Sequence, residues 1–220
     1  ESEPVNLESI LGLCVAQGIP QRMLRWHYRS QHESLITVSN FEFYDGKLVV
    51  FPSPDKGKRE VGLFYHYLPN TEYGRGKSRK NPGEAKKVAE AIMRHAKTSP
   101  DLTLGVAAFS ISQTEAIRDQ LEILRRQDPS CEEYFRSHPE EPFFIKNLEN
   151  VQGDERDVIL ISVGYGRTSE GRVSMNFGPL NHEGGERRLN VLITRARKRC
   201  EVFTNLKADD IDLGRTRARG

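Results

Sequence analysis

The chain has few cysteines, no long apolar run and almost no net charge. Its three cysteines, Cys14, Cys131 and Cys200, are far apart and form no CxxC pair. That argues against a disulfide scaffold or a zinc site and is typical of a reducing, intracellular setting. No apolar run approaches the roughly 18 residues that cross a bilayer, and we expect no signal peptide. We therefore expect a cytoplasmic protein without membrane contacts.

Charge is balanced rather than scarce. The sequence has 33 Lys and Arg against 31 Asp and Glu, a formal net charge of +2. Any contact with nucleic acid must therefore come from local basic patches, because the chain as a whole is no polycation. The histidines are scattered without HxxxH or HExxH spacing, so no metal site is predicted. The chain begins with Glu1 rather than Met, and we expect a piece of a longer protein.

Strand-like and helix-like segments alternate along the chain. Apolar spacing predicts helices over about 7–15, 32–44 and 82–96, and one that carries Ile117 and Leu121. Asn81 followed by Pro82 reads as a helix start, and Ser110 or Ser112 reads as the cap of the next helix. Strands are predicted over about 23–26, 61–67, 102–109, 143–146, 158–163 and 201–204. The alternation predicts an α/β fold with a mainly parallel sheet flanked by helices.

In such sheets, ligands bind outside the carboxyl ends of the strands. Polar residues follow three of the predicted strands: Tyr28 and Arg29 after the first, 110–113 after the buried strand at 102–109, and 147–155 after the strand at 143–146. We therefore expect these residues at the carboxyl edge of the sheet.

The segment 185–197, GERRLNVLITRAR, interleaves arginines with apolar residues and reads as one short helix. A guanidinium stays charged and matches the geometry of a phosphate, so the segment is a candidate anion site. The alternative is a basic helix face that is simply solvated.

Several motifs together resemble a known family. HYRSQHESLI with SNFEFYDGKL, then ENVQGDERDVILIS, GPLN and GERRLNVLITRAR, resemble in order and spacing the second motor domain of superfamily 1 helicases. The nearest branch is that of bacterial multidomain helicase-related proteins, in which a nuclease-like domain often follows the motor. The resemblance runs from about Leu7 to Asn205 and implies a RecA-like fold of the P-loop NTPase type. It divides the chain into an N-terminal helix continuing from an upstream domain (1–20), the RecA-like domain (21–206) and a polar tail (207–220).

The resemblance implies roles at a nucleotide. Arg29 and Arg195 match two arginines that reach the γ-phosphate, where phosphoryl transfer develops charge. Tyr28 matches an aromatic residue that stacks on adenine. The ordinary alternatives are a surface salt bridge for Arg29, a solvated helix face for Arg195 and a half-buried core position for Tyr28.

Other positions near the nucleotide are also predicted. Gly153 in the QGxE element would allow close backbone approach, and Glu155 would accept a hydrogen bond from the ribose or from the arginine cluster. Arg188 is a further nucleotide-binding candidate, although Arg188 and Arg197 could each contact a carboxylate of this domain instead. His27 stands where the family often has Gln or Asn.

Short polar residues are predicted to contact a single strand of nucleic acid, with DNA favoured over RNA. They are Ser110, Gln113, Asn147 and Asn150, and such contacts position a backbone without reading its sequence. As isolated residues they would equally be caps and turn formers.

The expected cofactor is ATP with Mg²⁺, bound mainly by an upstream RecA-like domain of the same polypeptide. Gly76-Lys77-Ser78 resembles the end of a P-loop, but Thr71 stands where that motif needs glycine. The fragment alone is therefore expected to lack ATPase activity. Two alternatives stay open: a non-catalytic nucleic-acid-binding module, and part of a nuclease, suggested by Asp154, Glu155 and Asp157.

Overall fold

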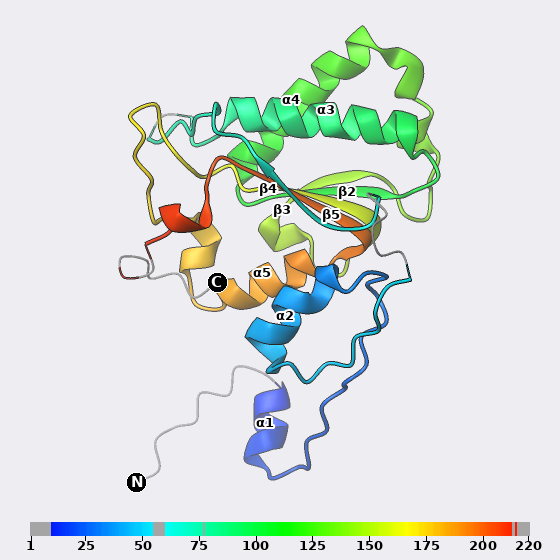
Figure 1. The fold of residues 1–220 in the computed structure, drawn as a ribbon, viewed down its shortest axis with the longest axis vertical. Coiled ribbons are helices and arrows are strands. Elements are labelled where there is room, and N and C mark those ends of the chain that lie inside the picture. Colours follow the sequence, from blue (N-terminus) through cyan, green and yellow to red (C-terminus); the bar gives the residue numbers. More distant parts are fainter. Residues whose placement is uncertain (1–9, 55–59, 77, 213, 215–220) are drawn as a thin grey trace.

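The structure, a computed structural model, describes residues 10–54, 60–76, 78–212 and 214 and is built on a five-stranded parallel sheet (Figure 1). The strands are β1 (Gly62–Tyr67), β2 (Leu104–Ala108), β3 (Phe144–Asn147), β4 (Arg156–Ser162) and β5 (Ala196–Thr204). They lie in the order β1-β5-β4-β2-β3, and every neighbouring pair is parallel. The predicted α/β fold with a parallel sheet is confirmed.

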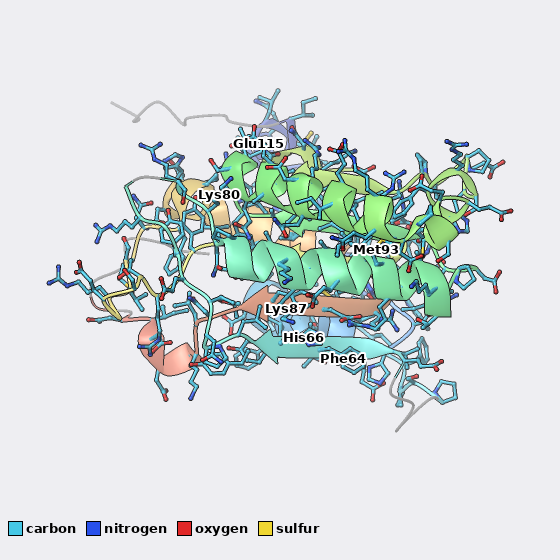
Figure 2. The ribbon with its side chains drawn as sticks, turned by 90° about the horizontal axis from the view of Figure 1, so that it is seen from above. Phe64, His66, Lys80, Lys87, Met93 and Glu115 are labelled. Carbon is cyan, nitrogen blue, oxygen red and sulfur yellow. The ribbon has the colours of Figure 1, made fainter. Side chains whose placement is uncertain are left out.

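Helices cover both faces of the sheet. On one face α3 (Pro82–Thr98) and α4 (Ile111–Gln127) lie side by side (Figure 2), and on the other are α2 (Ser34–Tyr44) and α5 (Gly185–Ile193). The short helix α1 (Ile10–Ala16) lies away from the sheet, beyond α2 (Figure 1). Five 3₁₀ turns complete the described elements: Pro129–Cys131, Tyr134–Arg136, Leu148–Asn150, Gly178–Asn181 and Ala208–Asp210.

The core has two layers because successive strand residues point to opposite faces. Val106, Val158 and Leu160 pack with α3 and α4, whereas Ile159 and Ile161 pack on the side of α2 and α5. All five residues of β2 are buried, as the continuous apolar run at 102–109 predicts. The central strands β2 and β4 are therefore largely buried between the two helical layers, whereas the edge strand β1 keeps Leu63 and Tyr65 exposed.

The predicted helix starts are confirmed. Asn81 caps α3, its Oδ1 accepting from Glu84 N at 3.0 Å, and Pro82 occupies the first turn. Of the two serines proposed for α4, Ser110 is the cap, its Oγ accepting from Gln113 N at 3.2 Å.

Two boundary predictions are wrong. Residues 23–26 form no strand, and only Trp26 makes an isolated bridge, to Val49. The helix predicted through Arg197 ends at Ile193, and β5 begins at Ala196. The cause is tertiary: Ala196 pairs with Arg156 of β4, and this pairing outcompetes another helical turn.

The expected N-terminal segment is described from Ile10 onward, so Leu7 lies outside the described residues. Of the expected tail, 207–212 and 214 are described. No helix in the described part of the chain is long and apolar enough to cross a membrane.

Candidate functional site

Three of the predicted residues, Arg29, Glu155 and Arg195, lie close together. Arg29 Nε donates to Glu155 Oε2 at 2.6 Å. Arg195 Nε donates to the main-chain oxygen of Val191 at 2.8 Å, and burial, with the nearby Arg29 charge, lowers the pKa of Arg195. Among the described residues, Arg195 forms no direct ion pair, although the nearby charges of Glu155 and Asp154 act to raise its pKa.

This cluster lies at the amino edge of the sheet, which corrects the expectation that Tyr28, Arg29 and Glu155 lie at the carboxyl edge. Glu155 immediately precedes β4 and Arg195 immediately precedes β5. The chain leaves β3 at Asn147 and returns through Leu148–Asn150 to begin β4 at the opposite edge. A residue a few positions after the end of β3 can therefore already lie at the amino edge, just before β4. Distance along the sequence from β3 does not show at which edge of the sheet such a residue lies.

Arg197 has a different role from Arg195. Its Nη1 and Nη2 bind Glu141 at 2.6 and 2.5 Å, and its Nε binds Asp157 Oδ1 at 3.2 Å. The hydrogen bond from Arg197 is the main cause that lowers the pKa of Glu141 to about 2. The alternative that Arg197 contacts a carboxylate of its own domain is confirmed.

Tyr28 is not a core residue. Its side chain is 89% exposed, directly before Arg29, and Leu24 and Trp26 beside it in sequence are also exposed. The half-buried alternative for Tyr28 is wrong. The preceding His27 accepts from Ser30 N at 3.1 Å, and burial followed by the Arg29 charge lowers the pKa of His27.

Gly153 and Arg188 stand apart from the ion pair. Gly153 has φ +89°, a conformation that favours glycine, and a Cβ there would have no neighbour within 4 Å. The turn geometry, rather than crowding, therefore explains this glycine. Arg188 Nη1 donates to the main-chain oxygen of Pro179 at 3.1 Å and contacts no carboxylate by any described bond, so that alternative fails for Arg188.

The carboxyl edge has a groove of about 580 Å³. Ser110 and Asn147 line it, with the Oδ1 of Asn147 buried and without a hydrogen-bond partner among the described residues. Asn150 is exposed and is not among the lining residues. The lining residues that were not predicted as site residues include two tyrosines and two arginines: Tyr73, Tyr165, Arg75 and Arg79. The basic stretch RGKSRK was the available signal for the two arginines.

The prediction that Gln113 contacts single-stranded nucleic acid is wrong. Its side chain is fully buried, so its amide cannot reach a bound nucleic acid. Its Nε2 donates to Ser162 Oγ at 3.0 Å, and its Oε1 accepts from Asn81 N at 2.8 Å. The network continues to the buried Glu84, whose Oε1 accepts from Ser162 Oγ at 2.6 Å. Burial raises the pKa of Glu84 to about 8. These buried hydrogen bonds join the starts of α3 and α4 to the end of β4.

The acids behind the nuclease alternative are engaged with basic side chains. Asp154 binds Lys146 Nζ at 2.6 Å, and Glu155 and Asp157 bind the arginines described above. The part of the chain that the structure describes has no group of three His, Cys, Asp or Glu placed to hold a metal ion.

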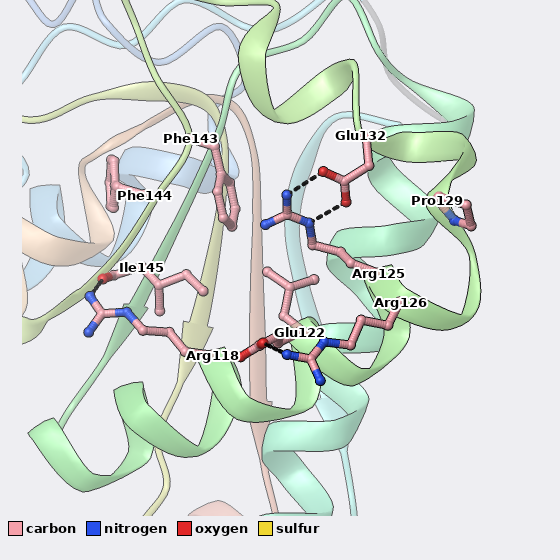
Figure 3. A pocket seen from close by; sticks show the side chains of 10 residues that line it. Arg118, Glu122, Arg125, Arg126, Pro129, Glu132, Phe143, Phe144 and Ile145 are labelled. Atoms are coloured by element: carbon pink, nitrogen blue, oxygen red, sulfur yellow. Dashed lines mark hydrogen bonds and ion pairs between the residues drawn. The ribbon is translucent and has the colours of Figure 1, made fainter.

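A separate cavity of about 680 Å³ lies between α4 and β3 (Figure 3). Arg125 in it forms a double hydrogen bond with Glu132, and Arg118 Nη2 donates to the main-chain oxygen of Ile145. None of the predicted site residues lines this cavity.

Comparison with known proteins gives the following matches. The model of a family described as AAA domain matches residues 7–207. A protein of Mycoplasma genitalium named as an uncharacterized ATP-dependent helicase is 33% identical over 193 residues, 86% of this chain and 16% of that protein. Its homologue in Mycoplasma pneumoniae matches with the same figures, so the chain spans only 16% of these relatives. A crystal structure of the C-terminal domain of a possible DNA helicase from Lactobacillus plantarum has a TM-score of 0.40 at 10% identity, covering 80% of this chain and 86% of that one.

Proposed function

The chain belongs to the AAA domain family, a helicase-type domain, and from this premise we propose that it is the C-terminal motor domain of an ATP-dependent superfamily 1 helicase or translocase. The observation that carries the proposal is the convergence of Arg29 and Arg195, far apart in sequence, at one edge of the sheet. A second RecA-like domain of the same polypeptide would face this edge and hold most of the ATP and Mg²⁺.

In this proposal the two guanidiniums bind the γ-phosphate across the cleft. Arg195 fits that role because it has no carboxylate partner among the described residues and its cationic charge is half-buried. Charge develops on phosphoryl oxygens during transfer, and an arginine supplied from a second domain is worth about 10³-fold or more in rate. The exposed ring of Tyr28 would stack on adenine, and the QGxE turn with Gly153 would approach the nucleotide.

The groove at the carboxyl edge would hold the single strand, with DNA favoured. Arg75 and Arg79 would contact phosphates, and Ser110 and Asn147 would supply short polar contacts without sequence readout. ATP binding would close the two domains, and hydrolysis would reopen them and advance the strand.

The alternative function is a nucleic-acid-binding module without a motor role, which the groove alone would also support. A nuclease of this chain is disfavoured because Asp154, Glu155 and Asp157 are each held by basic side chains. Arg29 and Arg195 distinguish the two functions, because a motor domain would need both for ATP hydrolysis and a non-catalytic binding module would not.

The test uses the intact protein that carries both motor domains. Arg29→Ala and Arg195→Ala are each expected to lower nucleic-acid-stimulated ATP hydrolysis by about 10³-fold while ATP binding is largely kept. Arg126→Ala is the matched control, because Arg126 forms an exposed ion pair with Glu122 on α4. Unchanged hydrolysis in both variants, with strand binding intact, would favour the module instead.

A further inference from the structure

The groove at the carboxyl edge lies between two loops that come from distant parts of the chain. The loop before α3 contributes Tyr73, Arg75 and Arg79 to its lining, and the loop after β4 contributes Tyr165 and Asn176. The ring centroids of Tyr73 and Tyr165 are 5.5 Å apart, so the two loops meet at these rings. Both arginines are on the first loop, and their position therefore depends on how that loop is held.

Asn205 joins the two loops, although it is not among the residues that line the groove. It follows β5 directly and is fully buried. Its Nδ2 donates to the main-chain oxygens of Thr71 at 2.7 Å and Arg167 at 3.2 Å, and its Oδ1 accepts from Arg167 N at 3.0 Å. Both N–H groups and the oxygen of the amide thus bind main chain, with Thr71 in one loop and Arg167 in the other.

The loops pack closely around this amide. A Cβ at Gly166 would lie 1.7 Å from Asn205 Oδ1, so the loop after β4 approaches the amide at a distance that only glycine permits. Tyr73 N donates to the main-chain oxygen of Arg167 at 2.8 Å. The same oxygen therefore accepts from Asn205 and from the loop before α3, and it is the point at which the loops are joined.

The loop before α3 has a conformation that needs support. Arg79 has φ +52°, a left-handed conformation that is uncommon for residues other than glycine. Arg79 N donates to the main-chain oxygen of Gly74 at 2.8 Å, which closes the loop on itself. At Thr71 the loop is bound by Asn205 and also by Asn81, whose Nδ2 donates to Thr71 Oγ1 at 3.1 Å. Asn205 is thus one of two asparagines that hold the start of this loop, and it also binds the opposite loop.

We propose that Asn205 is a positioning residue for the groove. It holds the loop before α3 against the loop after β4, so that Arg75 and Arg79 are ordered before single-stranded nucleic acid binds. Without this amide, part of the ordering would take place on binding and would lower the affinity. Asn205 itself does not contact the nucleic acid. This inference rests on the proposed function, in which the groove holds the single strand.

The test measures binding of a fluorescent oligothymidylate to the intact protein by anisotropy, without nucleotide. Asn205→Ala is expected to weaken binding about tenfold, the factor for about one loop residue that must be ordered on binding. Arg79→Ala is expected to weaken binding of the original protein and to have little further effect in the Asn205→Ala background, because the arginine is no longer held in place. A merely structural role of Asn205 would leave the two effects additive.

A second variant probes the same contact from the other loop. Gly166→Ala places a methyl group against Asn205 Oδ1 and is expected to weaken binding as Asn205→Ala does, with no further loss when the two are combined. If Asn205→Ala does not fold, Asn205→Ser is used, and the same loss is expected because one hydroxyl group replaces the two polar atoms of the amide.

Asn40→Ala is the matched control for these variants. Asn40 also binds the main chain of a loop, at Leu48 N and Leu48 O, but it lies on α2 and does not line the groove. Its replacement should therefore leave binding of the oligothymidylate unchanged.

Unchanged binding in Asn205→Ala would overturn the proposal, as would an effect of Arg79→Ala that is as large in the Asn205→Ala background as in the original protein. Binding that neither Arg75→Ala nor Arg79→Ala alters would overturn it too, because Asn205 would then have no cation to position. Failure of the proposed motor function is distinguishable, since it appears as unchanged ATP hydrolysis in Arg29→Ala and Arg195→Ala, whereas these binding measurements use no nucleotide.

Discussion

Glu84 is a carboxyl group without access to solvent, at the first turn of α3. It accepts hydrogen bonds from Ser162 Oγ at 2.6 Å and Gly164 N at 2.7 Å, and its other oxygen has no partner in the described part of the chain. Burial raises its pKa from 4.5 to about 8. Between these values the folded state holds a proton that the unfolded state releases, so stability falls as pH rises through this window.

Glu84→Gln should remove this pH dependence while keeping an oxygen acceptor. We expect the free energy of unfolding of the original protein to fall relative to the variant between about pH 5 and 8, each pKa unit corresponding to about 1.4 kcal/mol. Urea denaturation across that range measures it. Glu115→Gln, on the exposed side of α4 (Figure 2), is the control and should leave the pH profile as it was. Parallel profiles for Glu84→Gln and the original protein would contradict the prediction.

At the scale of the element, the start of α4 depends on one hydroxyl group. Ser110→Ala removes the acceptor for Gln113 N and should destabilise the fold by about 1 kcal/mol. Ser112→Ala is the control, because Ser112 lies one residue inside the helix and is not its cap. Chemical denaturation compares the two, and an equal loss in both would mean that the cap contributes nothing specific.

The elements that the sequence predicts well are those with local signals. Asn81-Pro82 and Ser110 mark helix starts through bonds within the first turn, and the apolar run at 102–109 marks a buried strand. The end of α5 has no such signal, because it is set by pairing of Ala196 with β4.

The candidate site is predictable in the same uneven way. Motif resemblance finds Arg29, Glu155 and Arg195, whose proximity the structure confirms. Gln113 looks like a surface amide in sequence, and only the packing of α3 against α4 shows that it is buried. The contribution of Arg75 and Arg79 to the groove depends on how the loop before α3 folds, which no periodic pattern encodes.

For the molecule as a whole, activity should require a second domain. The isolated chain is expected to have negligible ATPase activity, with or without single-stranded DNA, because in the proposed function its arginines would act on a phosphate that another domain holds. A coupled-enzyme ATPase assay tests this, with the intact protein as the positive control. ATP hydrolysis by the isolated chain at the rate of the intact protein would refute the prediction that a second domain is required.

Binding of single-stranded nucleic acid in the groove should be electrostatic and independent of the nucleotide sequence. Arg75→Ala and Arg79→Ala are each expected to weaken binding of several unrelated oligonucleotides to the same extent. Each should also lower the slope of log K against log salt concentration by about one, the amount for one lost phosphate contact. Fluorescence anisotropy at several salt concentrations measures both quantities, with Arg126→Ala as the control. A loss confined to one oligonucleotide sequence would indicate base readout instead.

The two candidate sites lie at opposite ends of the same strands, and β4 joins them directly. Glu155 precedes β4 and Ser162 ends it, and the six steps from the first to the last residue of β4 span roughly 20 Å at about 3.3 Å each. β4 is hydrogen-bonded to β2 and β5, and its side chains pack in both layers of the core. If the proposed function holds, a tilt of the domain at the nucleotide would be carried along β4 to the groove. The length of β4 would then set how far the bound nucleic-acid strand moves in each cycle.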